Sequence, residues 1–413
     1  MLKLFSENSR FRSYMVFEIL SSIGGGIFAI FMIWAIHAQY QNPFYTGLAG
    51  FMFAVMTIAN FLVGPFVDRH SKVTLLRVTC LVKFGVLSLV LVTSLTYLPG
   101  VWFLLLMIFI FSAATLVSNP ATTAYLPQIV EGEDLLKANS LLNVVASIAG
   151  IGVFVVILLL VDGGLGAIYG ISAGTMLMAC IASVFLRSGV KSEVQAEKGS
   201  TKTYFAELKE GLLFAKRGAL LFLIIAFVSQ DLAASIAYVN VPMLVQVHTG
   251  EAFSYFVLLG VAILGSVLGS VVIGILGQKF NTWTILFVCF VLAGVSRIIF
   301  VSIIADDFTR SLFVHAFYIC VGAAVGILFE TLTQKLPPKR LVARISTIVA
   351  SLMGLSSAFG ALLGGIMGTL IPDIDMIFVI QGVSYIAIGF FLCLLKPIRE
   401  LPNMNDVALT EDE

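Results

Sequence analysis

Long apolar stretches separated by short polar ones run along the whole chain. A helix needs about 20 mostly apolar residues to cross a bilayer, and twelve stretches meet that length within a few residues. They lie at 12–38, 43–67, 73–97, 101–128, 138–161, 165–187, 218–246, 252–277, 283–304, 309–336, 344–371 and 374–396. The pattern predicts an all-α polytopic membrane protein with twelve transmembrane helices.

The longest internal polar stretch, Ser188 to Arg217, divides the predicted helices six and six. Its roughly 30 residues are too few for a hydrophobic core of their own. We therefore expect an N-terminal six-helix bundle at 1–187, a cytoplasmic linker at 188–217, a C-terminal bundle at 218–396 and a cytoplasmic tail at 397–413. Phe205, Leu208 and Leu212 stand at helical spacing in the linker and predict an interfacial helix there.

The two sets of six resemble one another. A shift of 210 residues places four residues of the first set on similar ones in the second: Tyr45 on Tyr255, Gly50 on Gly260, Gly64 on Gly274 and Arg69 on Lys279. The pattern predicts a parallel internal repeat. Glycines also recur four apart within single stretches, and we interpret them as helix-packing faces. They are Gly265 and Gly269, and Gly360, Gly364 and Gly368.

Composition agrees with a membrane protein, because 59% of residues are hydrophobic and only 11% are charged. A water-soluble fold would have to expose most of that apolar surface. Placing the N-terminus in the cytoplasm puts almost all loop cations on one side, among them Lys3, Arg69, Lys198 and Lys339, and only Arg310 on the other. Cytoplasmic loops carry such an excess, so we expect both termini in the cytoplasm.

The five cysteines and four histidines show no spacing typical of a metal or redox site, and the cysteines are interpreted as packing residues. No nucleotide loop or nucleophile triad occurs either, so we expect no enzyme, no metal and no cofactor.

An ionisable residue inside a predicted span requires a structural or functional explanation, because inserting its charge at the centre of a membrane helix costs about 2.5–3.5 kcal/mol of free energy. Glu330, Glu18 and Asp231 are candidates for proton coupling, with Glu330 first because Gly322 and Gly326 leave room beside it. Asp231 lies too deep to reach the surface, and Arg297 at a similar depth is its expected partner. We interpret Lys83 as reaching the cytoplasmic surface and His315 as interfacial and uncharged.

Polar residues near these charges are candidates for lining a substrate cavity. Span 4 is interrupted by Pro120. The backbone groups that lose their helical hydrogen bonds at this proline must bond to other protein groups or to water in a cavity, so this helix should border a wet interior. The cavity candidates are Ser22, Asn119, Thr123, Gln230, Asp231, Ser235, Tyr238 and Glu330.

A short charged turn, Gly64-Pro-Phe-Val-Asp68-Arg69-His-Ser71-Lys72, joins spans 2 and 3. It resembles the loop between helices 2 and 3 of the major facilitator superfamily, with serine in place of the second glycine of that pattern. The resemblance implies that Gly64, Asp68, Arg69 and Lys72 form a gating motif at the cytoplasmic face.

A second resemblance is finer. Pro120-Ala121-x-x-Ala124-x-x-Pro127, followed by Ala138-Asn139, is similar to macrolide-efflux and related drug or siderophore exporters. It implies alternating access driven by a proton gradient and does not identify the cargo. Our leading hypothesis is export of amphipathic organic molecules in exchange for protons. The glycine-proline signature of many drug/proton antiporters is missing near Gly150 and Gly152.

Two other functions stay open: transport of one specific metabolite or siderophore, and a membrane sensor or scaffold that moves nothing. We expect as partners a small molecule, protons and the lipid bilayer, and no nucleic acid. A monomer in a bacterial cytoplasmic membrane is the expected form.

Overall fold

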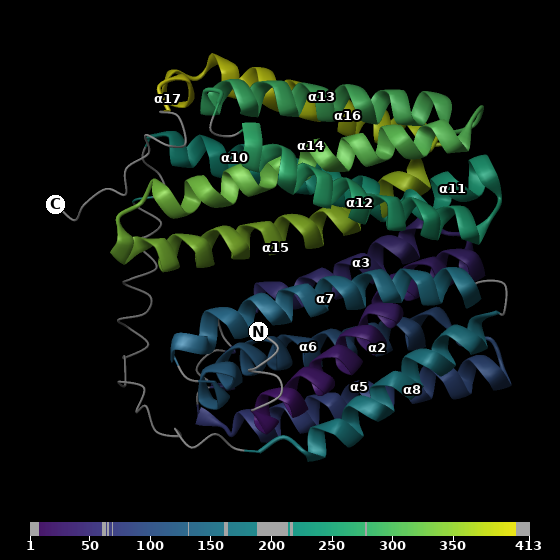
Figure 1. Ribbon diagram of the computed structural model, residues 1–413. Helices are drawn as coiled ribbons and strands as arrows, with labels where there is room; N and C mark the ends of the chain where they lie inside the picture. Colours follow the sequence, from purple (N-terminus) through teal and green to yellow (C-terminus); the bar gives the residue numbers. More distant parts are fainter. Residues whose placement is uncertain are drawn as a thin grey trace. The chain divides into compact units, whose positions relative to one another are not determined.

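The computed structural model describes residues 8–59, 63, 66–67, 69–130, 132–160, 164–187, 214, 218–276 and 279–401. The regular elements in these ranges are all helices (Figure 1). Ten are long and apolar enough to cross a membrane, and two shorter apolar helices lie at Pro43–Ile58 and Ile148–Leu160. The all-α membrane fold predicted from the hydrophobic pattern is confirmed.

The described chain divides into two compact units, Met1–Gln41 with Val55–Lys198, and Asn42–Ala54 with Gly199–Glu413. Helices of the first unit are α2 (Ser9–Tyr40), α5 (Lys72–Thr96), α6 (Val101–Ile129), α7 (Gly132–Leu160) and α8 (Leu165–Val184). Those of the second are α10 (Gly218–Tyr238), α11 (Val241–Thr249), α12 (Ala252–Leu276), α13 (Thr282–Ile303), α14 (Phe308–Lys335), α15 (Lys339–Leu370), α16 (Asp375–Leu394) and α17 (Lys396–Arg399).

Helix α3 (Pro43–Ile58) contributes its first part to the second unit. Gly47 faces the backbone of Gly365 on α15 so closely that a Cβ at Gly47 would overlap it. Gly50 lies beside Ala361 of the same helix. The first part of span 2 therefore packs with helices from the other end of the sequence, which the hydrophobic pattern does not indicate.

Packing within the two units follows one scheme. In the first unit α2 packs on α7 and α8, and α5 packs on α6 and α8. In the second, α10 packs on α15 and α16, and α13 packs on α14 and α16. Five helices of the second unit, α10, α13, α14, α15 and α16, take the places of the helices about 210 residues before them, so the packing supports the predicted internal repeat.

The predicted span 218–246 is two helices, α10 and α11, separated at Val239 and Asn240. Pro242 opens α11, where its missing N–H costs no helical hydrogen bond. The buried Asn240 side chain donates from Nδ2 to the carbonyls of Ile236 and Gly364, both at 2.8 Å. The break is thus stabilised by side-chain hydrogen bonds to buried backbone oxygens.

The glycine pairs do pack helices together. A Cβ at Gly265 or Gly269 of α12 would overlap backbone carbonyls of α14, and one at Gly360 or Gly364 of α15 would overlap backbone of α10. Interpretation of these glycines as packing faces is confirmed.

The predicted linker falls outside the described residues apart from Phe214, and so does the chain after Leu401. Ile398 and Leu401 are buried in the core of the second unit, although the sequence placed them in a tail.

Candidate functional site

A polar cavity of about 260 Å³ lies inside the first unit. It is bordered by α2, α5 and α6, and its polar lining includes Glu18, Ser22, Lys83, Ser118, Asn119 and Thr122. Three of these, Glu18, Ser22 and Asn119, are candidates that the sequence had already indicated. Ser118, Asn119 and Thr122 flank Pro120, so the expectation that span 4 borders a wet interior fits the cavity.

Lys83 is the cation of this cavity, and its side chain is only 8% exposed. Its Nζ donates to Ser118 Oγ at 2.9 Å and lies 5.5 Å from the centre of the Phe111 ring. The prediction that Lys83 reaches the cytoplasmic surface is wrong, because α6 supplies a hydrogen-bond acceptor and an aromatic face inside the unit.

Glu18 lines the same cavity, and its carboxylate and the Lys83 ammonium act on one another electrostatically. No direct ion pair joins them among the described residues. A molecule that enters the cavity can therefore contact both side chains. A hydrogen-bond acceptor on that molecule can bind the Lys83 ammonium, and a hydrogen-bond donor or a proton can bind the Glu18 carboxylate. The wall of the cavity thus carries one acidic and one basic side chain.

The second unit holds a different buried cation, Arg297, which is 3% exposed. Its Nε donates to Gln381 Oε1 at 2.7 Å, and its Nη1 lies 3.3 Å from His315 Nδ1. The rings of three residues face the guanidinium with centroids 4.7–5.0 Å away, namely Phe300, Tyr318 and Phe378. Cation–π contacts and neutral acceptors together replace an anionic partner.

The contact with Arg297 fixes the state of His315. Arginine can only donate, so Nδ1 of His315 accepts and the ring carries its proton on Nε2. The imidazole is uncharged, as the sequence suggested. It is nevertheless buried within the unit, 5% exposed, and not interfacial as predicted.

Asp231 has partners of its own and forms no ion pair with Arg297 among the described residues. Its Oδ2 accepts from Ser357 Oγ at 2.7 Å, which joins α10 to α15. The expected pair is therefore absent from this structure. Equal depth along two helices was the only basis for it, and depth does not say which faces meet.

Glu330 is exposed on α14, and its carboxylate has no partner among the described residues. A Cβ at Gly322 or Gly326 would meet nothing within 4 Å, so the open space predicted beside Glu330 is present.

The remaining cavity candidates are scattered. Thr123 is exposed and donates to the carbonyl of Asn119 at 3.2 Å. Gln230 lies near Tyr385, whose hydroxyl donates to its carbonyl at 3.5 Å, and Ser235 abuts Gly360. Tyr238 is exposed. The neighbouring face of α10, with Ser229 and Leu232, lines a mostly apolar hollow of about 370 Å³ together with Gln381 of α16.

The gating motif is described only in part, since Gly64 and Asp68 lie outside the described residues. Arg69 is exposed, while Lys72 Nζ donates to the carbonyls of Val67 and His70 at 2.9 and 3.2 Å. Ser71 caps α5, its Oγ accepting from Thr74 N at 3.4 Å. Serine thus has a structural use where the family pattern carries glycine.

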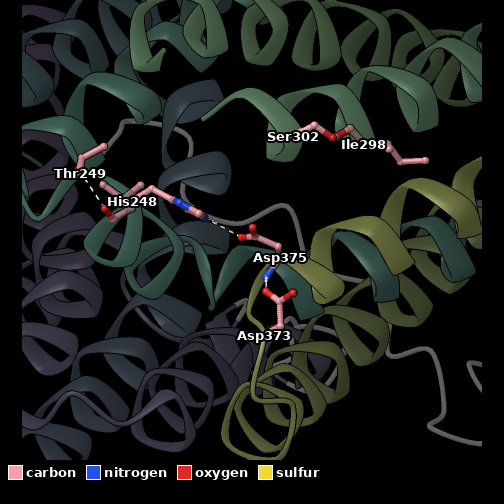
Figure 2. Close-up of polar contacts among 7 residues, drawn as sticks. His248, Thr249, Ile298, Ser302, Asp373 and Asp375 are labelled. Carbon is pink, nitrogen blue, oxygen red and sulfur yellow. Dashed lines mark hydrogen bonds and ion pairs between the residues drawn. The ribbon is translucent and has the colours of Figure 1, made fainter. Parts of the chain in front are cut away.

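Figure 2 shows a polar contact that the sequence did not indicate. His248, in the last turn of α11, points toward Asp375 in the first turn of α16, with Nε2 2.8 Å from Oδ1. The backbone N–H of Asp375 donates to Asp373 Oδ1 at 3.0 Å. An anion such as Asp375 at a helix N-terminus suits the helix dipole. The residues are 127 apart in sequence, which hides the contact.

A family model of the Major Facilitator Superfamily matches residues 15–361 of the chain. The chain belongs to this superfamily. Membership makes it a membrane transporter by family and agrees with the two units of similar packing. No curated protein matches the chain.

Solved structures share the fold at low identity. The nucleoside transporter NupG is 14% identical over 93% of this chain and 98% of its own, with a TM-score of 0.73. A bacterial homologue of the iron transporter ferroportin is 16% identical over 92% and 97%, with a TM-score of 0.69. The xylose transporter XylE from E. coli is 12% identical over 96% and 98%, with a TM-score of 0.67. Similarity at this level supports the fold and does not identify the cargo.

Proposed function

We propose that the chain is a proton-coupled secondary transporter that exchanges protons for a small polar organic solute, with Glu18 and Lys83 as its coupling pair. The observation that carries this proposal is that these two opposite charges line one cavity and interact electrostatically without a direct ion pair.

Exchange follows from competition for Glu18. A proton on Glu18 removes the negative charge that offsets Lys83, which leaves an uncompensated buried cation. A solute that donates a hydrogen bond to the ionised carboxylate keeps Glu18 negatively charged, so that Glu18 still offsets the charge of Lys83. The same solute excludes the proton from Glu18. Because one group binds either the proton or the solute, their binding free energies are coupled with opposite sign.

Lys83 supplies the second contact. Ser118 and Phe111 hold its ammonium at the cavity wall, where it can donate to an acceptor of the solute. A cargo with a hydrogen-bond donor and a hydrogen-bond acceptor, such as an amino alcohol or a polyol amine, can bind both Glu18 and Lys83.

Among the other coupling candidates, Asp231 is hydrogen-bonded to Ser357 and Glu330 is exposed. Neither faces an opposite charge among the described residues. Glu18 is therefore the first coupling residue that we propose, with Glu330 and Asp231 after it.

Export of larger amphipathic drugs is the second candidate, and the Pro120-Ala121 stretch favours it. The cavity favours the polar solute, because about 260 Å³ is below the roughly 300–1,000 Å³ of sites that take drug-sized molecules.

The two candidates separate in a cargo screen. The purified protein is heated in detergent with single compounds from a set of amino alcohols, sugars, nucleosides, dipeptides, ethidium and erythromycin. Compounds that raise the melting temperature are then offered to reconstituted vesicles with an imposed pH gradient. Accumulation of small polar compounds supports the proposal. Accumulation of ethidium or erythromycin alone would favour drug export.

A further inference from the structure

Three sulphur atoms meet inside the first unit. Cys80 Sγ of α5 lies 3.2 Å from Cys180 Sγ and 3.8 Å from Met176 Sδ, both on α8. Met176 and Cys180 are four residues apart and so share one helix face. We call Cys80, Met176 and Cys180 the sulphur triad. Burial of Cys80 and Cys180 agrees with their interpretation as packing residues, but a separation of 100 residues conceals that the two lie side by side.

The triad is buried but borders the polar cavity. Its residues are 2%, 0% and 8% exposed in the order Cys80, Met176, Cys180. Cys80 also lines the cavity that contains Lys83. An ion in the cavity can therefore contact the triad first at Cys80.

The sulphur ligands of the triad determine which class of metal ion it can bind. Thiolate and thioether ligands favour soft metals such as Cu(I), whereas Mg²⁺ and Ca²⁺ require oxygen ligands. A structural Zn²⁺ site needs four ligands, and no three His, Cys, Asp or Glu side chains cluster suitably among the described residues.

The distances suit one bound ion. An ion that contacts two sulphur atoms at about 2.3 Å each, the usual zinc–sulphur length, can span at most about 4.6 Å between them. Both measured separations from Cys80 are shorter than this.

The negative charge that the triad acquires on binding Cu(I) can be balanced by a nearby cation. Binding Cu(I) to the two thiols forms two sulphur–copper bonds and releases two protons to the cavity, which leaves one net negative charge on the site. If Glu18 takes up one of the released protons, the Lys83 ammonium, which interacts electrostatically with Cys80, offsets that charge. We propose that the sulphur triad is a Cu(I) site at the wall of the polar cavity. It does not depend on the proposed transport function.

Cu(I) binding is measured on the full-length protein, purified in detergent and kept reduced, by its ability to withdraw Cu(I) from a coloured bicinchoninate complex. The wild-type protein should take one ion per chain. Cys80→Ala and Cys180→Ala should each bind at least tenfold more weakly, and Met176→Leu several-fold more weakly. Cys289→Ala removes a thiol of α13 outside the triad and should bind like wild type.

X-ray absorption of the loaded wild-type protein supplies a readout that needs no variant, and it should show sulphur neighbours alone. The site is overturned if wild-type protein withdraws no Cu(I), if Cys80→Ala with Cys180→Ala binds as tightly as wild type, or if the copper has only nitrogen and oxygen neighbours. If an alanine variant elutes as an aggregate, Cys180→Ser and Met176→Leu carry the comparison. Wild-type affinity in both would contradict the triad.

Discussion

Lys83, which is buried, and Glu18, which is partly buried beside the same cavity, require an explanation at the scale of single residues. Removing one leaves the other buried without compensation, which costs more than removing both. We expect Lys83→Met and Glu18→Gln to lower the unfolding free energy, and the double variant to lose less than the sum of the two. Groups coupled within one site differ from additivity by about 0.5–3 kcal/mol.

Thermal unfolding of the purified variants in one detergent measures this coupling. Lys279→Met, which removes an exposed lysine, is the matched control and should add to Glu18→Gln without interaction. Strictly additive losses for Lys83→Met and Glu18→Gln would show that the two charges do not sense one another.

Arg297 gives the second prediction at this scale. Lysine retains the charge but not the planar fork that donates to Gln381 and His315 while three rings stack around it. We expect Arg297→Lys to destabilise the protein by about 2 kcal/mol or more, because buried acceptors lose their donors. Arg310→Lys changes an exposed pair with Asp307 and should stay within about 1 kcal/mol of wild type. Equal melting temperatures for both variants would contradict the account of Arg297.

These residues also show what a sequence can reveal about a site. Depth along a helix follows from counting residues, and that count is why Glu18 and Asp231 became candidates. The same count places Lys83 eleven residues beyond Lys72, about 16 Å along the axis, and led us to expect its long side chain at the cytoplasmic surface, whereas that side chain is buried. Rotation about the axis does not follow from counting, so the partners Gln381, Ser357 and Ser118 could not be predicted.

At the scale of helices, close packing depends on glycine where backbones touch. Gly269 of α12 faces the carbonyl of Cys320, whereas Gly274 of the same helix faces nothing within 4 Å. We expect Gly269→Ala to lower stability by about 1–3 kcal/mol, because the added methyl forces α12 away from α14. Gly274→Ala is the matched control and should be neutral or slightly stabilising. A larger loss for Gly274→Ala than for Gly269→Ala would contradict this packing.

Helices themselves were predictable because apolar length alone identifies a spanning helix. Two details of the helical fold were not predictable from apolar length. The break between α10 and α11 falls inside the single predicted span 218–246, where Pro242 was the available signal. The packing of Gly47 against Gly365 joins residues 318 positions apart, which periodicity within one helix cannot indicate.

At the scale of the whole molecule, the placement of charge predicts orientation. Since cations gather in the loops on one side, we expect the turn with Glu251 to lie outside the cell and the turn with Lys279 inside. Single cysteines at these positions, Glu251→Cys and Lys279→Cys, are treated in intact cells with a membrane-impermeant thiol reagent. Glu251→Cys should react and Lys279→Cys should react only after lysis. The reverse pattern would place both termini outside.

The central claim is that Glu18 couples solute movement to protons. The measurement that tests it most directly compares two modes of transport in reconstituted vesicles, using a compound from the cargo screen. One mode is accumulation driven by an imposed pH gradient, and the other is exchange of labelled for unlabelled compound without a gradient. Glu330→Gln, at an exposed carboxylate, serves as the comparison variant at matched protein content.

We predict that Glu18→Gln abolishes gradient-driven accumulation and retains exchange, while Glu330→Gln retains both. Undiminished gradient-driven accumulation by Glu18→Gln would contradict the account, and its loss in Glu330→Gln alone would transfer the coupling role to Glu330.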